Sequence, residues 1–408
     1  MKSVTELDCQ GKVVFYRPDY NVPLKNGVIQ DDFRIIATFP TIDTLIEKGA
    51  KIVIGSHMGR PDGKVVEDLE LTPVAQRIAD QYDDVTIRLA HSVDDPDVKA
   101  AISEMEEGDI LILPNLRFYA GEEENDKKFA GSLASLADYY VNDAFACDHR
   151  AHASIVGVPE LLPAYAGFLV QAEVEHLGGI LEDPTPPFVV VMGGAKVSDK
   201  IGVIEKLGRV ADRILIGGAM ANTFLLAMGE EIGASVAEPE KVEEAKSLME
   251  KFGSKLIIAE DYLQDKEGEG FKYLDIGEKA VTTFIEELKK AKTVFWNGSL
   301  GYTEDELFAG GSKAIAEFLA GSKAKTIIAG GDTVELISRL NIRRKFNFVS
   351  TGGGAALEFL AGDELPGIAV LDKEVKFKAA EEKEVATDEA KDSEQEVAAD
   401  QKEENLDK

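Results

Sequence analysis

Residues 188–200 read FVVVMGGAKVSDK: a valine-rich apolar run, a glycine pair, and then a polar segment that leads into a helical pattern. The same order returns in four more segments, RILIGGAMANTF at 213–224, TVFWNGSLG at 293–301, TIIAGGDTVELI at 326–337 and FNFVSTGGGAAL at 346–357. Strand, glycine turn and helix in succession are typical of a parallel α/β sheet. The five segments therefore predict such a sheet in the second half of the chain.

These turns also suit phosphate. Glycine lets the backbone come close to an anion, and a helix N-terminus directs free N–H groups and partial positive charge toward it. The carboxyl ends of parallel strands meet at one sheet edge, so several such turns together indicate a nucleotide site, whereas one alone would be weak evidence.

The first half alternates strand and helix as well. Apolar runs predict strands at 12–16, 51–55, 109–113 and 139–142, and helical patterns cover 33–48 and 72–81. Prolines interrupt this order at 159–163, a single helix is expected at 164–181, and the sequence EDPTPP ends it at 182–187. The fold class predicted is α/β, with two doubly wound parallel-sheet (Rossmann-like) domains joined by a connector helix.

The expected boundaries are 1–163 for the first domain, 164–187 for the connector, 188–371 for the second domain and 372–408 for a C-terminal segment. Residues 381–408 hold twelve acids, four lysines and no aromatic residue. This composition predicts a solvated, disordered acidic tail, and an interaction role for it stays open.

Composition limits the partners. A formal net charge of −30 argues against nucleic acid and against anionic membranes. The two cysteines, Cys9 and Cys147, are far apart and in no C-x-x-C pair, which suits a reducing compartment and argues against zinc. A thiol nucleophile at Cys147, near His149 and His152, has no supporting partner spacing. Without a signal-peptide core or a long apolar run, the expected location is cytoplasmic.

Basic residues follow the predicted strands of the first half. Among them are Arg17, Arg34, His57, Arg60, Arg117, His149, Arg150 and His152. One arginine would most often make a surface ion pair, but several at matching topological positions favour binding of phosphate or carboxylate. Asp19 and Asn21 lie two apart, so in an extended segment both point the same way, toward the same small anion. One anion-binding lobe and one nucleotide-binding lobe predict a two-domain phosphotransferase whose closure excludes water.

Eight motifs resemble those of the phosphoglycerate kinase family, in the expected order from about residue 10 to residue 371. In the first half they are RPDYNVP at 17–23, HMGRP at 57–61, LRF at 116–118 and HRAHAS at 149–154. In the second half they are GGAKVSDK at 193–200, WNG at 296–298, GGDT at 330–333 and STGGGA at 350–355.

The resemblance implies reversible phosphoryl transfer between 1,3-bisphosphoglycerate and ADP, giving 3-phosphoglycerate and MgATP, by a monomer. It implies that Arg34 and Lys196 act in catalysis and that Asp332 holds Mg²⁺. The implied phosphoglycerate-binding residues are Asp19, Tyr20, Asn21, Arg34, His57, Met58, Gly59, Arg60, Arg117 and Arg150. The implied nucleotide-binding residues are Gly194, Lys196, Lys200, Gly218, Asn297, Glu304, Gly330, Gly331, Asp332 and Thr333.

This chain departs from the family pattern at several positions. Pro18, Ser299, Ala329 and Phe348 replace a usual valine, proline, glycine and histidine, and Ala146-Cys147-Asp148 replaces a usual Gly-Thr-Ala. None of these changes removes a charged or phosphate-contacting side chain.

Three other function classes fit a chain with glycine turns after its strands less well. A nicotinamide-dependent dehydrogenase needs G-x-G-x-x-G and a Walker-type ATPase needs G-x-x-x-x-G-K-[ST], and both fingerprints are missing. A nucleotide-binding protein without activity is the third, but Arg34, Lys196, Lys200 and Asp332 are all present.

Overall fold

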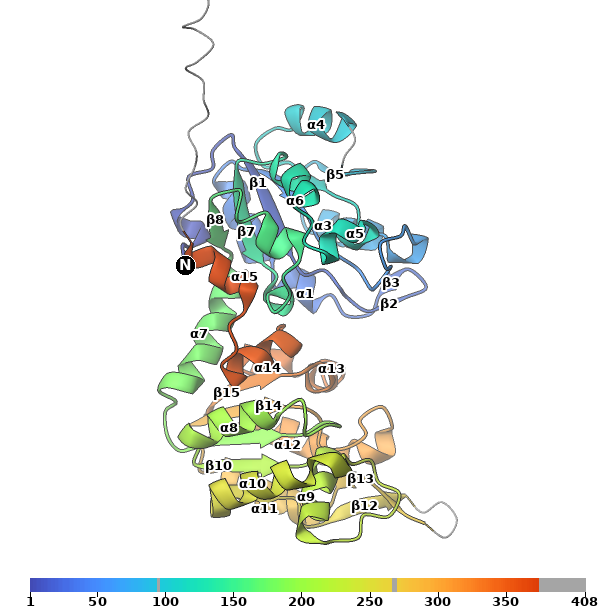
Figure 1. Cartoon of the computed structure of the whole chain (residues 1–408), viewed down its shortest axis with the longest axis vertical. Helices are drawn as coiled ribbons and strands as arrows, with labels where there is room; N and C mark the ends of the chain where they lie inside the picture. Colours follow the sequence, from blue (N-terminus) through green and yellow to red (C-terminus); the bar gives the residue numbers. More distant parts are fainter. Residues whose placement is uncertain (94–95, 266–269, 374–408) are drawn as a thin grey trace, which may run out of the picture. The chain divides into compact units, whose positions relative to one another are not determined.

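The computed structural model describes residues 1–93, 96–265 and 270–373, so the predicted acidic tail lies outside the described residues. Within them the parallel strands form two six-stranded sheets (Figure 1). The predicted fold class, with two parallel sheets and a helix between them, is confirmed.

The first sheet has the order β5-β6-β4-β1-β7-β8. Its strands are β1 (Val13–Pro18), β4 (Lys51–Ile54), β5 (Ile87–Leu89), β6 (Ile110–Ile112), β7 (Tyr139–Asp143) and β8 (Ala164–Ala166). All neighbours pair in parallel.

The second sheet has the order β11-β10-β9-β14-β15-β16 and is likewise parallel. Its strands are β9 (Phe188–Met192), β10 (Arg213–Ile216), β11 (Leu256–Ile258), β14 (Thr293–Asn297), β15 (Lys325–Ala329) and β16 (Phe348–Val349).

Helices cover both faces of each sheet. In the first half, α1 (Phe33–Ile36), α2 (Phe39–Glu47) and α3 (Thr72–Ala79) share one apolar cluster, while α4 (Pro96–Ser103) and α6 (Lys127–Ala134) belong to the other. In the second half, α8 (Ile201–Val210), α9 (Met220–Met228), α10 (Val242–Phe252) and α14 (Gly354–Ala361) oppose α11 (Glu278–Leu288), α12 (Gly310–Ala320) and α13 (Gly331–Arg339).

Strand β9 shows why the apolar runs are continuous. All five of its residues are buried, Val190 and Met192 on one face of the sheet and Val189 and Val191 on the other. A strand covered on both faces has no polar side, so alternation disappears from its sequence. Each fully buried valine contributes about 1.5–3 kcal/mol relative to exposure.

Two predicted helices need correction. The segment expected as one helix over 33–48 is interrupted between α1 and α2, because Pro40 has no N–H to donate and its ring clashes with the carbonyl four residues earlier. The helix expected from residue 164 begins only at Phe168, as α7 (Phe168–Glu182), since residues 164–166 pair with β7 as strand β8.

The strand-turn-helix prediction also failed in one segment. After β14 the chain passes through a turn and the short helix η8 (Glu306–Phe308) before α12 begins at Gly310. Sequence analysis missed the edge strands β5 and β11. It also missed two antiparallel hairpins, β2 (Leu24–Lys25) with β3 (Val28–Ile29), and β12 (Tyr262–Asp265) with β13 (Lys272–Ile276).

Helix α7 is anchored to the first sheet at its start. Oδ1 of Asp143, the last residue of β7, accepts the N–H groups of Leu169 and Val170 at 2.9 and 3.1 Å, and its Oδ2 accepts the Tyr16 hydroxyl. At the other end of the described chain, α15 (Pro366–Ala369) and η10 (Val370–Asp372) return to the first half, where Met1 N contacts Asp372 (Figure 1).

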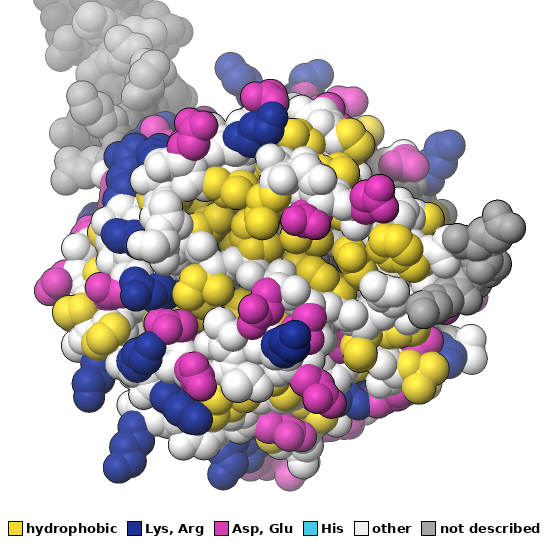
Figure 2. All heavy atoms as spheres, turned by 90° about the horizontal axis from the view of Figure 1, so that it is seen from below, with side chains coloured by type: hydrophobic (Ala, Val, Ile, Leu, Met, Phe, Trp, Pro, Cys, Tyr) yellow, Lys and Arg dark blue, Asp and Glu magenta, His cyan; other side chains and the backbone are white. Residues whose placement is uncertain are grey.

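On the face of the molecule in Figure 2, apolar side chains gather in a hollowed central area, bordered by charged side chains of both signs. The net negative charge of the chain is therefore not spread evenly over this face. Among the described residues no helix is both long and apolar enough to cross a bilayer.

Candidate active site

Each sheet has one point where the order of its strands reverses direction along the chain. In the first sheet this point lies between β1 and β7, and in the second between β9 and β14. Loops leaving the carboxyl ends of strands on either side of such a point diverge and leave a crevice. Many of the predicted site residues follow these strands or their neighbours.

The first crevice is built on Asp19, directly after β1. Its Oδ2 accepts a hydrogen bond from Nη1 of Arg34, on α1, and its Oδ1 accepts the N–H of Asn21 at 3.0 Å. Oδ1 of Asn21 in turn accepts the N–H of Gly59 at 3.0 Å. Burial alone would raise the pKa of Asp19, but the Arg34 guanidinium and other positive neighbours lower it below its ordinary value.

The residues of the HMGRP motif at 57–61, which follow β4, extend this network. The His57 and Met58 side chains are buried, and the carbonyl of Gly59 accepts Nη1 of Arg117 at 2.7 Å. Burial lowers the pKa of His57 well below its ordinary value, against the opposing effect of Asp19 and with the help of three arginines. The imidazole is therefore neutral at physiological pH.

The remaining predicted residues of this half differ in setting. Tyr20 is buried, with its hydroxyl 3.1 Å from Thr38 Oγ1. Arg60 is exposed, and Arg150 is half-buried with its Nε donating to His149 Nε2 at 3.0 Å. Arg17, expected to follow the first strand, instead lies within β1; it is fully buried and donates to Ser154 Oγ and to the Pro18 carbonyl, which makes it part of the core.

The second crevice is made of backbone. The N–H of Gly193 donates to the carbonyl of Asn297 at 2.9 Å, and the N–H of Gly194 donates to Ser299 O at 2.6 Å. Gly194, Gly218 and Gly298 all have positive φ. A Cβ on Gly298 would lie 2.4 Å from Gly193 O, and one on Gly218 would lie 2.5 Å from Ser299 O. Only glycine fits these close approaches.

Polar groups surround the place where the backbones of Gly193–Gly194 and Gly298–Ser299 meet, which we call the glycine crossing. Thr333 is buried and its Oγ1 accepts the N–H of Gly298 at 2.8 Å, while Gly330 precedes α13 with a φ of 92°. Asn297 is buried at the end of β14, and its Nδ2 has no hydrogen-bond partner among the described residues. A buried donor without a partner is costly, and such donors are rare unless a ligand or water meets them.

The two lysines of the GGAKVSDK motif differ. Lys196 is exposed, whereas Lys200 is buried at the start of α8. Burial lowers the pKa of Lys200, although the carboxylates of Asp199 and Asp332 act in the opposite direction. Lys200 therefore faces the same region as Asp332.

A cavity of about 270 Å³ opens beside the glycine crossing. Four predicted nucleotide-binding residues line it: Gly194, Gly218, Glu304 and Asp332. Sequence analysis missed Val236 and, on the β12–β13 hairpin, Tyr262, Tyr273 and Asp275. Tyr262 and Tyr273 are stacked with ring centroids 4.6 Å apart. The tyrosine, leucine and isoleucine of KYLDI at 272–276 could have indicated a strand, but nothing in the segment indicated this location.

A larger cavity, about 390 Å³, lies at the start of α7 and contains none of the predicted site residues. It is lined by residues of both halves, among them Phe33, Phe168, Arg343 and Phe348. Near it, Nη2 of Arg343 contacts Oδ2 of Asp31 at 2.5 Å, and its guanidinium stacks over Phe33.

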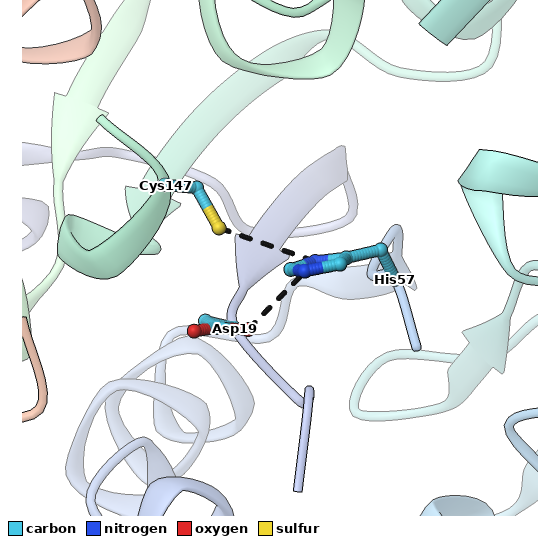
Figure 3. Close-up of side chains that lie close together, drawn as sticks. All are labelled: Asp19, His57 and Cys147. Carbon is cyan, nitrogen blue, oxygen red and sulfur yellow. Dashed lines mark hydrogen bonds and ion pairs between the residues drawn. The ribbon is translucent and has the colours of Figure 1, made fainter. Parts of the chain in front are cut away.

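The geometry argues against the thiol-nucleophile hypothesis for Cys147. Cys147 Sγ and Asp19 Oδ1 approach the same ring nitrogen of His57, Nδ1, at 3.9 and 3.7 Å (Figure 3). A relay needs the base to face the thiol with one nitrogen and the carboxylate with the other. Burial also raises the pKa of the thiol to about 12, so it stays protonated.

Guanidinium groups near the switch point of one parallel α/β half, and a glycine crossing with a cavity beside it in the other, are features of a two-lobed phosphotransferase. The family model described as phosphoglycerate kinase matches residues 4–363. The chain belongs to the phosphoglycerate kinase family.

Individual relatives agree with this membership. The phosphoglycerate kinase of Roseiflexus sp. (strain RS-1) is 45% identical over 389 residues, covering 91% of this chain and 98% of the relative. That of Rubrobacter xylanophilus is 44% identical over 385 residues, with the same coverage.

Solved structures agree as well. The phosphoglycerate kinase of Coxiella burnetii is 36% identical with a TM-score of 0.78, covering 90% of this chain and 98% of the other. That of Pyrococcus horikoshii is 33% identical with a TM-score of 0.81, covering 91% and 98%.

Proposed function

We propose that this chain catalyses reversible phosphoryl transfer between 1,3-bisphosphoglycerate and ADP, giving 3-phosphoglycerate and ATP. One combination supports the proposal: in a chain matched to this family over residues 4–363, groups suited to an anion follow the strands around the switch point of each sheet. The first set is made of guanidinium groups and the second of backbone N–H groups and lysines.

In the first half, Arg34, Arg60, Arg117 and Arg150 would take the phosphate and carboxylate groups of the phosphoglycerate. Asp19 and Asn21 would orient its hydroxyl and carboxyl end. The network that joins Arg34, Asp19, Asn21 and Gly59 supports this assignment, because it fixes three chain segments against one another before substrate arrives. His57, Tyr20 and Met58 shape the pocket from the buried side.

In the second half, Gly194 and Gly218 would let the nucleotide come close to the backbone, and Glu304 would hold the ribose hydroxyls. Gly330, Gly331 and Thr333, at the start of α13, would hold the terminal phosphates. The unpartnered Nδ2 of Asn297 supports a phosphate oxygen at this position. Lys196 and Lys200 would contact the phosphates and the group in transfer.

A magnesium ion fits the same end of the cavity. Asp332 is an exposed carboxylate in the first turn of α13, and Mg²⁺ in phosphoryl-transfer enzymes is held by one or two carboxylates plus substrate phosphates. When bound, the ion would neutralise phosphate charge. Asp332 is the residue of this chain that would hold it.

The chemistry needs no general base. The acceptor oxygen of the phosphoglycerate is a carboxylate, which is already ionised, and an acyl phosphate is a reactive donor. The protein must therefore position the two substrates, exclude water and stabilise the charge of the phosphoryl group in transfer. Arg34 from the first half and Lys196 from the second are the groups proposed for charge stabilisation.

The proposal also covers the oligomeric state, the domain boundaries and the cellular location. Both anion-binding sets belong to one chain, so a monomer is sufficient, and the domain boundaries 1–163, 164–187 and 188–371 remain part of the proposal. The cysteine content and acidic composition support a cytoplasmic location.

The test is a coupled assay with 3-phosphoglycerate, ATP and Mg²⁺, run across a salt series. We expect ADP formation that requires all three components and stops when a chelator removes the metal. Binding of both substrates without turnover would instead support the non-catalytic alternative, and ATP hydrolysis without 3-phosphoglycerate would contradict the proposed acceptor.

A further inference from the structure

Three side chains of the metal-ligating kind meet in the first crevice. Asp19 follows β1, His57 follows β4 and Cys147 lies in the short helix after β7, so three neighbouring strands bring together residues far apart in sequence (Figure 3). All three are buried, and their ligand atoms lie within 4.8 Å of one another. This is the one group of this kind found among the described residues.

We propose that Asp19, His57 and Cys147 form a binding site for a soft divalent cation, Zn²⁺ or Cd²⁺. Zinc bonds to oxygen, nitrogen and sulfur are about 2.0–2.3 Å long, which places tetrahedral ligand atoms about 3.3–3.7 Å apart. Nδ1 of His57 lies 3.7 Å from Asp19 Oδ1 and 3.9 Å from Cys147 Sγ. Small side-chain movements would therefore complete three corners of a tetrahedron.

The three ligand atoms hold one another only weakly, because 3.7 Å exceeds the length of a hydrogen bond and 3.9 Å is at the outer limit for sulfur. Asp19 is kept in place by Arg34 and by the N–H of Asn21, so His57 and Cys147 are the side chains that would move. His57 is neutral and directs Nδ1 toward both partners. As the sulfur–metal bond forms, the thiol proton leaves to solvent.

Neighbouring charges decide which ion fits. Arg17, Arg34 and Arg117 surround the cluster and oppose a cation. Arg17 and Arg117 have acidic partners outside the cluster, Glu122 at 3.8 Å and Glu123 at 3.2 Å, whereas the partner of Arg34 is Asp19 itself. Mg²⁺ and Ca²⁺ prefer oxygen ligands and find one carboxylate here, whereas a thiolate and an imidazole favour Zn²⁺ and Cd²⁺.

The site also has a consequence for activity, which rests on the proposed function. Asp19 and His57 belong to the proposed phosphoglycerate pocket, so a bound soft cation and the substrate exclude each other. Zinc would inhibit in competition with 3-phosphoglycerate and not with ATP.

The direct test is a Cd²⁺ titration of the full chain without substrates, followed by the ultraviolet thiolate-to-cadmium charge-transfer absorption. We expect saturation at one ion per chain. Cys147→Ser should abolish the absorption and, because it removes a direct ligand, weaken binding by at least the roughly 10- to 100-fold that loss of an outer-shell partner costs. Cys9→Ser, which changes the other buried cysteine, should leave both unchanged. No absorption in the unaltered chain, or equal loss in both variants, would overturn the site.

A second measurement does not depend on variants. X-ray absorption at the zinc edge of the Zn²⁺-loaded chain should show one sulfur at about 2.3 Å among nitrogen and oxygen ligands. No sulfur, or more than one, would contradict the three-residue site. Sulfur ligation together with inhibition that 3-phosphoglycerate does not relieve would keep the metal site and refute the proposed substrate pocket.

Discussion

The two halves share one architecture but are proposed to bind anions with different parts of the chain. The crevice of the first half is lined with guanidinium groups that are balanced by acids, as in the pairs Arg34–Asp19 and Arg117–Glu123. The crevice of the second half is lined with glycines, of which Gly194, Gly218 and Gly298 have positive φ, and its backbones come closest where Gly298 meets Gly193. Charged side chains characterise the site of the first half, and close backbone packing characterises the site of the second half.

This difference predicts how each site tolerates change. Gly59 and Gly298 both have positive φ, so a Cβ is strained at either, but at Gly59 it would meet only the flexible side chain of Leu69, whereas at Gly298 it would meet backbone atoms that cannot move aside. The first site should therefore respond mainly to loss of charge. The second should respond mainly to added bulk, with its lysines as the exception.

Lys196→Ala tests that exception. Lys196 is exposed and supplies a mobile charge to an otherwise backbone-lined site, so its loss should reduce kcat on the order of 10³-fold. The KM for 3-phosphoglycerate should change little, because that substrate binds in the other half. Steady-state kinetics with both substrates varied would measure this, and an unchanged kcat would remove Lys196 from the mechanism.

Gly298→Ala tests the backbone side of the comparison. The strained φ of 91° and the 2.4 Å approach to Gly193 O should cost roughly 3 kcal/mol in the free energy of unfolding. Gly331→Ala is the matched control, since a Cβ there meets no atom within 4 Å. Urea denaturation without nucleotide would compare them, and similar losses would show that the crossing is not the constraint.

Arg34→Ala tests the first half, where charged side chains rather than backbone groups are proposed to bind the anion. We expect kcat to fall about 10²-fold, because the variant removes a charge proposed to stabilise the phosphoryl group and leaves Asp19 without its partner. Arg209→Ala, at an exposed position near the end of α8, is the control and should remain within about twofold. Equal effects of the two changes would contradict the assignment of Arg34.

The same contrast explains what could be predicted from the sequence. Apolar runs such as FVVVM predict buried parallel strands, and glycine pairs predict the turns that follow those strands. Both signals are local, because each lies within a few consecutive residues. The interruption of the first long helix was also local, since Pro40 stands in the sequence, and that signal was overlooked.

Long-range features could not be predicted in this way. Strand β8 forms because residues 164–166 pair with β7, and nothing within those three residues indicates it. Tyr262 and Tyr273 reach the cavity from the β12–β13 hairpin, which belongs to none of the five strand, glycine turn and helix segments. The grouping of Asp19, His57 and Cys147 depends on strand order, which is why a search for short cysteine spacings argued against zinc.

Asp148→Asn tests how the titration of one buried carboxyl in the first half makes stability depend on pH. Burial raises the pKa of Asp148 to about 7, and its Oδ2 has no partner among the described residues. Between the pKa in the unfolded chain, about 3.9, and that folded value, the folded state keeps a proton that the unfolded state has lost. Stability therefore falls as pH rises through this window.

The variant should remove that fall, so its stability relative to the unaltered chain should improve by about 2 kcal/mol between pH 5 and pH 8. The amide oxygen that the substitution introduces is able to accept the hydrogen bond from Asn142 Nδ2, which Asp148 Oδ1 accepts at 2.8 Å in the unaltered chain. Denaturation at several pH values would measure this, with the exposed Asp8→Asn as control. Parallel pH profiles for the unaltered chain and Asp148→Asn would show that this carboxyl does not titrate as expected.

Asn297→Ala separates binding from stability in the second half. Because Nδ2 of Asn297 has no partner among the described residues, deleting it removes no hydrogen bond from the free protein. Stability should change by no more than about 1 kcal/mol, while the KM for ATP rises about tenfold through loss of one phosphate contact. Thr333→Val is the informative counterpart, since Thr333 Oγ1 accepts the N–H of Gly298 at 2.8 Å and its loss should lower stability as well. If Asn297→Ala lowered stability as much as Thr333→Val without changing the KM, the amide would be a structural group, and the glycine crossing would bind phosphate through its backbone alone.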